Sequence, residues 1–348
     1  MTAPEPPNAP PQSILYLSQH QILELNATDM STALVDVEKA FSLHEKGDTI
    51  LPDKVSMGWG KTVLEEKTSG RINAMPSYLG GDYQMAGIKW IGSNPKNIAQ
   101  DLPRASAIII LNDPETKFPL AIMDGTLISL VRTGAASGIA VKYLSRKESE
   151  NLVVIGAGLQ CTAQIEATLC QRPHLKNIYI SDLDMHRAEQ LAATLSEQSG
   201  KKITPVAEPK RHAQEADILI TATGAAQPVI DASWLNPEGC LYINLGGYEC
   251  AYDTVQRADK RIVDSWSHVK HRNASTIARM ANEGLLDDSQ VYANIGDIIN
   301  DKKEGRKNDQ EIIYYNGVGL GILDIAIATR VYRSAMSLEA GTILPYWD

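Results

Sequence analysis

The stretch LVVIGAGLQC, residues 152–161, decides the fold because it joins an apolar strand to a glycine turn. The turn opens a predicted helix over 162–169, and the next strand ends beside Asp182. Gly156 allows a tight turn, and Gly158 lets the backbone approach a pyrophosphate at the helix N-terminus. Asp182 lies at the distance, about 20 residues, where an acid accepts hydrogen bonds from the adenosine ribose. This order predicts a dinucleotide-binding unit.

Two further features of this stretch bear on the cofactor. Cys161 stands where the dinucleotide pattern has its third glycine, so an ordinary strand-to-helix turn is the alternative interpretation. Asp182 favours NAD over NADP, because a carboxylate repels the ribose 2′-phosphate that distinguishes NADP. Arg187, one turn into the next predicted helix, is the one nearby cation that would weaken this preference. We therefore expect NAD as the cofactor.

The composition excludes several classes of partner. The chain has 348 residues, enough for two domains, and 43% of them are hydrophobic and 22% charged, as in globular proteins. Its net charge of −9 argues against nucleic acid or an anionic membrane as a partner. No apolar run approaches the ~18 residues of a membrane span. We expect a small molecule as the substrate.

The N-terminus and the four cysteines indicate the compartment. Residues 1–13, MTAPEPPNAPPQS, predict a disordered tail, since they are rich in proline and lack the basic start and apolar core of a signal peptide. The cysteines show no CxxC spacing, which fits a reducing cytoplasm. His268 and His271 form the one close histidine pair, without a third ligand nearby, so we expect no metal site.

The remaining segments predict two kinds of architecture. Short β-type runs separated by turns continue to about residue 127, and a helix over 126–143 then leads into alternating strands and helices. The predicted fold class is α/β, with a Rossmann doubly wound domain over 133–317 inserted in an α+β domain formed by 14–132 and 318–348. Predicted strands cover 15–17, 71–75, 86–91, 107–111, 119–123, 151–155, 177–181, 217–221, 240–245 and 261–264. One predicted helix begins after Ser18, which caps it, and two others cover 30–46 and 318–336.

Four cations before residue 133 are candidate anion-binding residues. Lys89 lies in the apolar run GIKWIG, where a half-buried ammonium needs a nearby anion to offset its desolvation. Arg132 lies in an apolar helix of small residues, and its planar guanidinium suits a carboxylate. Arg71 and Arg104 precede predicted strands and are weaker examples. For each of the four, the alternative is a structural salt bridge to one of the chain's 42 acids or a stem that reaches solvent.

A second cluster, NLGGYEC over residues 244–250, follows the fourth strand of the predicted parallel sheet. The carboxyl ends of parallel strands face the crevice where ligands bind. Glu249 is therefore expected near the nicotinamide, where a carboxylate can take or give protons, although a solvated loop acid is the alternative. The candidates for cofactor contacts on this rim are Thr221, Thr223, Leu245, Gly246 and Gly247.

Several segments resemble those of the ornithine cyclodeaminase/mu-crystallin family, over nearly the whole chain after the tail. They are MP (75–76), GIKWIGSNP (87–95), LVRTGAASGIA (130–140), VVIGAGLQ (153–160) and NGVGLGILDIAIA (316–328). Within the family, the chain is most similar to the N-(2-amino-2-carboxyethyl)-L-glutamate dehydrogenases, which make 2,3-diaminopropionate for siderophores and peptide antibiotics. RINAMPSYLGG (71–81), RASAIIILNDPET (104–116) and VDSWS (263–267) carry that likeness.

The resemblance implies an assembly and roles for single residues. It implies a homodimer that joins through shared β-structure, so that the α+β domain both binds substrate and dimerises. It also implies that Lys89 and Arg132 hold the substrate's α-carboxylate, and that Glu249 is the family's acid after the fourth strand. From the residues and the resemblance together, we expect Lys89, Glu249 and Arg132 to be catalytic. The residues placed at the substrate are Arg71, Met75, Lys89, Arg104 and Arg132, and those placed at NAD include Gly156, Gly158, Leu159, Gln160 and Asp182.

The leading hypothesis is NAD-dependent oxidative cleavage of N-(2-amino-2-carboxyethyl)-L-glutamate to L-2,3-diaminopropionate and 2-oxoglutarate, with NADH formed and water activated by Glu249. This substrate has three carboxylates, which suits four cations better than ornithine, which has one. The chain departs from the cyclodeaminases at Ala251-Tyr252-Asp253, where they have Pro-Gly-Lys, and at Gly317, where they have serine. The alternatives are ornithine cyclodeamination, a ketimine or imino-acid reductase, and a mu-crystallin-like binding protein.

Overall fold

The computed structural model describes residues 12–59 and 70–347. The predicted tail lies outside these residues except for Gln12 and Ser13, which belong to strand β1 (Gln12–Leu17). Contacts within the chain define two compact units. Among the described residues, the first unit comprises 12–28, 49–59, 70–129 and 324–347, and the second comprises 29–48 and 130–323. The domain boundaries drawn from the sequence stay a prediction.

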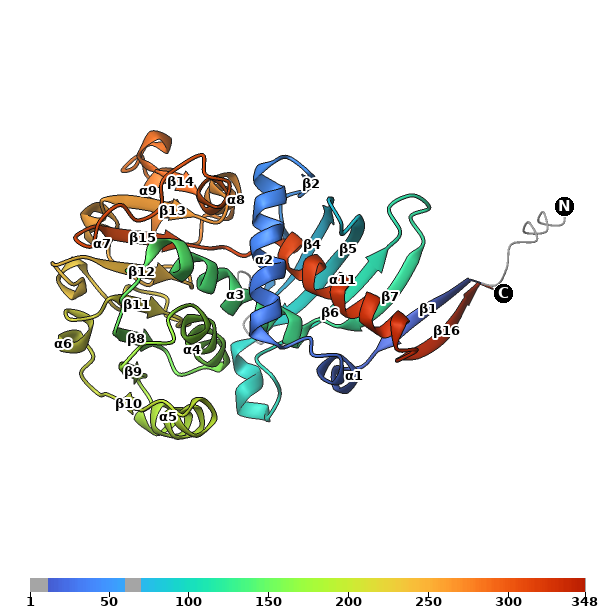
Figure 1. Ribbon diagram of the computed structural model, residues 1–348, viewed down its shortest axis with the longest axis horizontal. Helices are drawn as coiled ribbons and strands as arrows, with labels where there is room; N and C mark the ends of the chain where they lie inside the picture. Colours follow the sequence, from blue (N-terminus) through green and yellow to red (C-terminus); the bar gives the residue numbers. More distant parts are fainter. Residues whose placement is uncertain (1–11, 60–69, 348) are drawn as a thin grey trace, which may run out of the picture. The chain divides into compact units, whose positions relative to one another are not determined.

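The first unit is built on an eight-stranded sheet (Figure 1). Its strands follow the order β16-β1-β7-β6-β5-β4-β2, and β3 also pairs with β4. All pairs are antiparallel except β1 with β7, so the expected antiparallel, β-rich character is present with one exception. The bounds are β2 (Thr49–Ile50), β3 (Val55–Trp59), β4 (Gly70–Leu79), β5 (Met85–Ser93), β6 (Ala105–Asn112), β7 (Pro119–Asp124) and β16 (Thr342–Trp347).

Side chains alternate across this sheet, as the sequence pattern predicts. Ile109 of β6 is fully buried, whereas its neighbour Ile108 is 44% exposed on the other face. Helix α11 (Gly321–Ser337) packs on the buried face, and this explains Gly87 in β5: a Cβ there would lie 2.8 Å from Cδ1 of Ile325. The unit's shorter helices are α1 (Gln19–Glu24), capped by Ser18 as predicted, and η2 (Pro95–Gln100).

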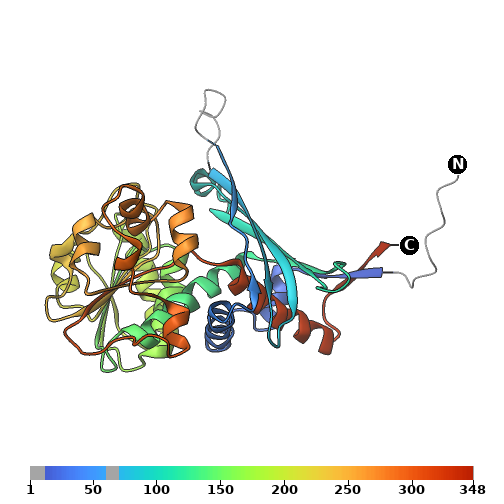
Figure 2. The same cartoon turned by 90° about the horizontal axis from the view of Figure 1, so that it is seen from above.

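The second unit is an eight-stranded sheet with parallel pairing throughout, and helices cover both of its faces (Figure 2). The order is β10-β9-β8-β11-β12-β15-β13-β14, and the predicted Rossmann-type doubly wound fold is confirmed. The strands are β8 (Asn151–Ile155), β9 (Asn177–Ser181), β10 (Ile203–Pro205), β11 (Ile218–Thr221), β12 (Cys240–Asn244), β13 (Lys260–Val263), β14 (Ala293–Asn294) and β15 (Ile312–Asn316). The helices are α2 (Met30–Glu45), α3 (Thr126–Leu144), α4 (Leu159–Gln171), α5 (Met185–Ser199), α6 (Lys210–Ala213), α7 (Tyr252–Arg257), α8 (Trp266–Arg272), α9 (Thr276–Asn282), α10 (Ile295–Ile299), η3 (Ala232–Trp234) and η4 (Asp288–Gln290).

Strand β15 is the main element that the sequence analysis missed. It lies between β12 and β13, inside the sheet, and all five of its residues are buried. The run IIYYN is short and stands between a charged loop and the apolar residues of α11, so periodicity alone does not reveal it. Because β15 is parallel to β12, the loop after it opens at the same edge of the sheet as the loops after β11 and β12.

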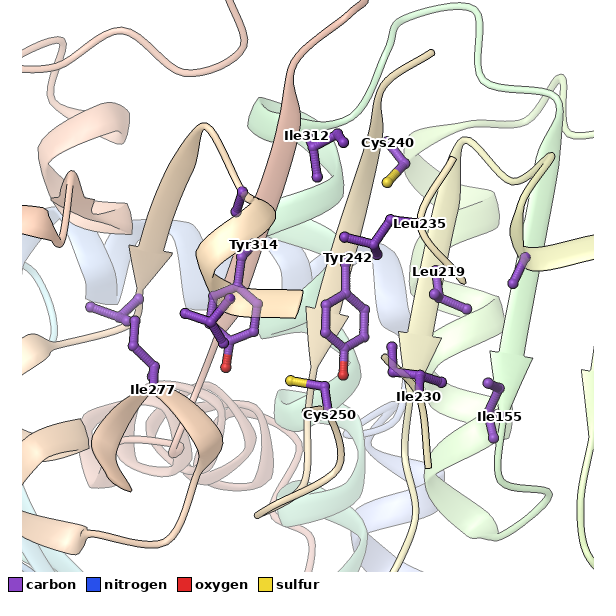
Figure 3. Close-up of a cluster of buried hydrophobic side chains, with 14 of the residues drawn as sticks. Ile155, Leu219, Ile230, Leu235, Cys240, Tyr242, Cys250, Ile277, Ile312 and Tyr314 are labelled. Atoms are coloured by element: carbon purple, nitrogen blue, oxygen red, sulfur yellow. The ribbon is translucent and has the colours of Figure 1, made fainter. Parts of the chain in front are cut away.

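A buried cluster on one face of this sheet supports that edge (Figure 3). The rings of Tyr242 on β12 and Tyr314 on β15 have their centroids 5.7 Å apart. The Tyr314 hydroxyl donates to Oδ1 of Asn244 (2.9 Å), and the Tyr242 hydroxyl lies 2.9 Å from Oγ1 of Thr221. Burial raises the pKa of both phenols well above the usual value, so both stay neutral. The two tyrosines therefore fix the last residues of β11 and β12.

Small residues on α3 let α4 pack closely. A Cβ on Gly134 would lie 2.5 Å from the carbonyl oxygen of Ala163 in α4, so only glycine fits the crossing. Cys161, at the place of the third glycine, is fully buried in the first turn of α4. Burial and, second, the nearby Asp182 raise the pKa of this thiol to about 12, so the residue packs as a neutral side chain.

Candidate functional site

The turn between β8 and α4 has the geometry of a pyrophosphate cradle. Gly156 has a φ of +107°, and a Cβ there would lie 2.6 Å from the carbonyl oxygen of Ala222, so glycine is required. Gly158 is the N-cap of α4, and no side chain of the described residues caps the helix. Leu159 and Gln160, both predicted at NAD, form its first turn. Free amides at a helix N-terminus bind phosphate groups, so these residues fit NAD.

Asp182 follows β9 and turns its carboxylate toward the same turn. Oδ2 accepts a hydrogen bond from the amide of Ala157 (2.7 Å), and Oδ1 accepts one from the amide of Asp184 (3.0 Å). Nη2 of Arg187 lies 4.0 Å from the position that a Cβ on Gly158 would take. A carboxylate and a guanidinium therefore both lie near the turn where the sequence predicts the pyrophosphate of NAD.

Glu249 is fully buried and accepts five hydrogen bonds. Its Oε1 accepts from the amide and the hydroxyl of Thr223, at 2.5 and 2.6 Å. Its Oε2 accepts from Oγ1 of Thr221 (3.0 Å), Nδ2 of Asn244 (2.8 Å) and the amide of Gly246 (2.6 Å). The structure thus gathers three residues predicted at NAD around one carboxylate, which the sequence analysis placed as a separate catalytic group.

This geometry does not support the predicted proton transfer by Glu249. A carboxylate offers about four lone-pair sites, and five donors already point at them. The predicted neighbours at this rim have backbone roles: the amide of Leu245 donates to the carbonyl of Thr221 (3.1 Å), and the carbonyl of Gly247 accepts from the amide of Glu249 (3.1 Å). The arrangement is that of a carboxylate which holds two chain segments together.

Arg132 on α3 is 9% exposed and packs against the loop after β15. Gly319 in this loop has a φ of +74°, and a Cβ there would lie 2.3 Å from Nη1 of Arg132. Two neighbours fix the loop: Oδ2 of Asp264 accepts from the amide of Gly319 (2.8 Å), and Nη1 of Arg272 donates to the carbonyl of Val318 (3.1 Å). The missing side chain at position 319 therefore makes the space that the guanidinium occupies.

Lys89 of the first unit is fully buried and is bound to an internal acid. Its Nζ lies 2.8 Å from each carboxylate oxygen of Asp324 on α11 and 3.0 Å from Oγ of Ser129. The structural salt bridge that the sequence left open as an alternative is therefore present. Met75 is the cross-strand partner of Lys89, and Arg71 points to the same face because side chains alternate along β4.

Arg71 and Arg104 form a pair of like charges in the first unit. Arg71 lies opposite Ser93, and Arg104 precedes Ala105, which pairs with the same serine. Partial desolvation and, second, the positive charge of Arg104 lower the pKa of Arg71. Both side chains are exposed, and within residues 12–59 and 70–347 neither guanidinium has an acidic partner. Two neighbouring guanidiniums have the charge and the donors that suit a carboxylate.

Two acids near the predicted cations were not predicted: Asp324, which pairs with Lys89, and Asp264, which fixes the loop that packs against Arg132. Asp324 is the one acid in the apolar segment GILDIAIA, and an acid in such a helix signals a buried ion pair. Asp264 directly follows the strand KRIV, at the edge where ligands bind. The sequence therefore shows that both acids are unusual, but it does not show which residue each one contacts.

Other kinds of site find no support in the described ranges. No three histidine, cysteine, aspartate or glutamate side chains gather there as a metal site requires. None of the described helices combines the length and the apolar character that a membrane crossing needs. The four cysteines are free thiols, and only Cys170 is exposed.

The sequence matches the ornithine cyclodeaminase/mu-crystallin family over residues 15–339. The chain belongs to this family. One relative is the N-((2S)-2-amino-2-carboxyethyl)-L-glutamate dehydrogenase of Staphylococcus aureus, which is 31% identical over 335 residues, 96% of this chain and 98% of that protein. The predicted family and its diaminopropionate branch are thereby confirmed as similarities.

Two solved structures share the fold over almost the entire chain. One is the Δ1-pyrroline-2-carboxylate reductase of Thermococcus litoralis in complex with NADH and L-proline, at 34% identity, a TM-score of 0.87, and coverage of 94% of this chain and 99% of that one. The other is an archaeal alanine dehydrogenase dimer with bound NAD, at 34% identity, a TM-score of 0.85, and coverage of 97% and 100%. The predictions of an NAD-dependent oxidoreductase and of NAD as its cofactor are confirmed, while the relatives' named substrates differ.

Proposed function

We propose that this oxidoreductase cleaves N-(2-amino-2-carboxyethyl)-L-glutamate, with NAD⁺ and water as co-reactants, to L-2,3-diaminopropionate, 2-oxoglutarate and NADH. The bond between the secondary amine and the glutamyl Cα is oxidised and then hydrolysed. The observation that carries this choice is the pair of guanidiniums, Arg71 and Arg104, without an acidic partner among the described residues. The likeness to the Staphylococcus aureus enzyme, which is named for this compound, supports the same choice.

The charge count favours a substrate with several carboxylates. Asp324 offsets the charge of Lys89, so the positive charge of the first unit's site comes from Arg71 and Arg104. Two neighbouring guanidiniums repel each other, and a bound carboxylate removes that cost with charge-assisted hydrogen bonds. Substrates with one carboxylate, such as ornithine, alanine or proline, leave this pair without an anion. A substrate with three carboxylates supplies one.

Within this proposal each group has one task. NAD, when bound, accepts hydride from the glutamyl Cα. The amides of the Gly156 turn hold its pyrophosphate, and Asp182 holds its adenosine ribose. Arg132 binds the α-carboxylate beside the reacting carbon, and Gly319 keeps the space for that guanidinium open. Arg71 and Arg104 bind another carboxylate of the substrate.

An assay with purified protein tests the proposed reaction. With NAD and N-(2-amino-2-carboxyethyl)-L-glutamate, we expect absorbance at 340 nm to rise as NADH forms in equal amount with 2-oxoglutarate. Ammonia from L-ornithine without net NADH would identify a cyclodeaminase, and loss of NADH with Δ1-pyrroline-2-carboxylate would identify a reductase. Either result, together with no turnover of the tricarboxylate, contradicts the proposal. NAD binding without turnover of any of these compounds would indicate a binding protein.

We further propose a homodimer formed through the outer face of the first unit's sheet. The outer patch comprises Val55, Met57, Trp59, Trp90 and Ile108, whose exposed fractions range from 40% to 62%. Successive cross-strand pairs bring three of them, Val55, Trp90 and Ile108, into one row across the sheet. Contiguous apolar surface of this kind marks an interaction site. The archaeal alanine dehydrogenase dimer supports a second copy as the occupant.

Light scattering coupled to gel filtration tests the dimer. We expect the wild type to elute as a dimer and Trp90→Glu, which places a charge in the outer patch, to elute as a monomer. Leu285→Glu is the matched control, because Leu285 is 52% exposed in the second unit and lies outside the patch. A dimeric Trp90→Glu variant, or a monomeric wild type, would overturn this interface.

We propose the cytoplasm as the compartment. Free thiols at all four cysteine positions support a reducing environment. Cell fractionation of the tagged full chain tests this, and recovery with periplasmic or secreted markers would contradict it.

A further inference from the structure

We infer that Glu249 is a positioning residue for NAD, which holds the Gly156 turn in place through Thr223. The inference rests on the proposed placement of NAD at this edge of the sheet. It assigns to a carboxylate at the catalytic rim a role in building the cofactor site, in place of the proton transfer that the sequence suggested. Three observations carry it: the donor set of the carboxylate, the path from Thr223 to the turn, and the space at Gly246.

The carboxylate joins two strands beyond the point where their own pairing ends. Strands β11 and β12 pair as far as Thr221 with Asn244, and the amide of Leu245 adds one more bond to the carbonyl of Thr221. Beyond this, the amides of Thr223 and Gly246 both donate to Glu249, one to each carboxylate oxygen. Glu249 therefore continues the connection between the two strands with its side chain.

One of the two segments that it holds packs directly on the glycine turn. The amide of Ala222 donates to the carbonyl of Ile155 (2.8 Å), the last residue before the turn. A Cβ on Gly156 would lie 2.6 Å from the carbonyl oxygen of Ala222 and 3.3 Å from Cγ2 of Thr223. The position of residues 222–223 thus sets the space available to the turn. Glu249 fixes those residues through two bonds to Thr223.

The site requires a carboxylate at this position and nothing larger than glycine opposite it. A Cβ on Gly246 would lie 2.5 Å from Cδ of Glu249, so any side chain at position 246 would clash with this carboxylate. Each oxygen of Glu249 accepts from a backbone amide, and an amide donor cannot be rotated away. In Glu249→Gln, whichever atom became the NH₂ group would face one of these N–H donors. The neutral variant keeps the shape of the side chain and breaks one of the two connections.

Binding of NAD without substrate tests this role. We expect Glu249→Gln to raise the dissociation constant of NAD, measured by isothermal titration calorimetry, by on the order of tenfold. We expect kcat at saturating NAD to fall less than threefold and the pH profile of kcat to keep its shape. Thr223→Val, which removes one hydroxyl donor and keeps the branched shape, should raise the same constant about threefold and serves where Glu249→Gln does not fold. Glu283→Gln is the matched control, since Glu283 is exposed and accepts one hydrogen bond, from Tyr252.

Each other outcome overturns the inference. A kcat reduced 10²-fold or more, with NAD affinity unchanged and one limb of the pH profile lost, would make Glu249 the proton-transfer group. A lower melting temperature with unchanged NAD affinity would make its role structural only, and an equal loss of affinity in Glu283→Gln would show a nonspecific effect. Asp182→Ala separates the placement of NAD from the role of Glu249. If Asp182→Ala weakens NAD binding while Glu249→Gln and Thr223→Val do not, only the role of Glu249 is wrong. If none of the three weakens NAD binding, the placement of NAD fails with it.

Discussion

The carboxyl edge of the second unit's sheet and the covered face of the first unit's sheet hold charged side chains in different ways. At the edge, Asp182 and Glu249 accept hydrogen bonds from backbone amides and short side chains at most 28 residues away. On the sheet face, Lys89 pairs with Asp324, which is 235 residues away, and Arg71 lies near a second guanidinium. Charges at the strand ends are held mainly by backbone amides of neighbouring loops, whereas the charge inside a strand depends on a side chain far away in the sequence.

Removal of Asp324 should have the largest effect, because the buried charge of Lys89 depends on this one acid. Asp324→Asn leaves the buried ammonium of Lys89 without its counter-charge, so we expect the free energy of unfolding to fall by about 3–5 kcal/mol in urea titrations. The double variant Lys89→Met/Asp324→Leu should recover most of this loss. Glu115→Gln, at an exposed turn, is the control and should change stability by less than about 0.5 kcal/mol. A loss below about 1 kcal/mol in Asp324→Asn would show that Lys89 does not depend on this acid.

Arg132 is the cation of the second unit whose surroundings are fixed by a loop at the carboxyl edge. Arg132→Ala should lower kcat/KM by about 10²-fold or more, because it removes the pair that orients the reacting carbon. NAD affinity should stay within twofold of wild type, since the guanidinium is placed on the substrate. Steady-state kinetics and calorimetry measure the two effects. Near wild-type kcat/KM would remove Arg132 from the site.

A half-buried imidazole in the second unit can be compared with the fully buried ammonium of Lys89. His44 on α2 has its ring centroid 6.1 Å from that of His268, and burial and, second, His268 lower the pKa of His44 to about 4. The unfolded state binds more protons than the folded state between pH 6.5 and 4, so stability falls as the pH falls through this window. Between pH 7 and pH 4.5, we expect His44→Gln to lose about 2 kcal/mol less of its free energy of unfolding than the wild type. Urea titrations at the two pH values measure this. Equal slopes in variant and wild type would contradict the lowered pKa.

At the edge itself, Asp182 tests how far local geometry sets the cofactor preference. Asp182→Ala should weaken NAD binding roughly tenfold and narrow its advantage over NADP, because the charge that repels a 2′-phosphate is gone. Arg187→Ala in the same background should then lower the affinity for NADP. Calorimetric titration with both cofactors measures this. An unchanged ratio of the two affinities would point to another selector.

The sequence predicted best those features that local backbone geometry determines. The Gly156 turn and the Ser18 cap were readable because the residue type itself indicates the backbone role. The acid after β9 was readable from its spacing to that turn. The strand β15 was not, because its five residues carry no resolvable period. Glu249 was placed on the correct rim, but its five donors come from two strand ends that only the fold brings together.

The same reasoning explains the cations of the first unit. The apolar pattern around Lys89 correctly signalled a buried charge in need of an anion, but it did not show that the anion is part of the chain. For Arg71 and Arg104 the pattern was weaker, and the pairing of β4, β5 and β6 brings them together. The pattern of a strand predicts whether a side chain is buried and on which face of the sheet it lies, but not which residue it contacts.

The most direct test of the central claim compares the substrate with its two mono-amides, in which one carboxylate away from the reacting carbon is replaced by a carboxamide. The account predicts that wild-type kcat/KM falls about tenfold or more for one of the two amides, and that the double variant Arg71→Met/Arg104→Met no longer distinguishes that amide from the tricarboxylate. A wild type indifferent to both replacements, or a preference that survives in the double variant, would contradict it.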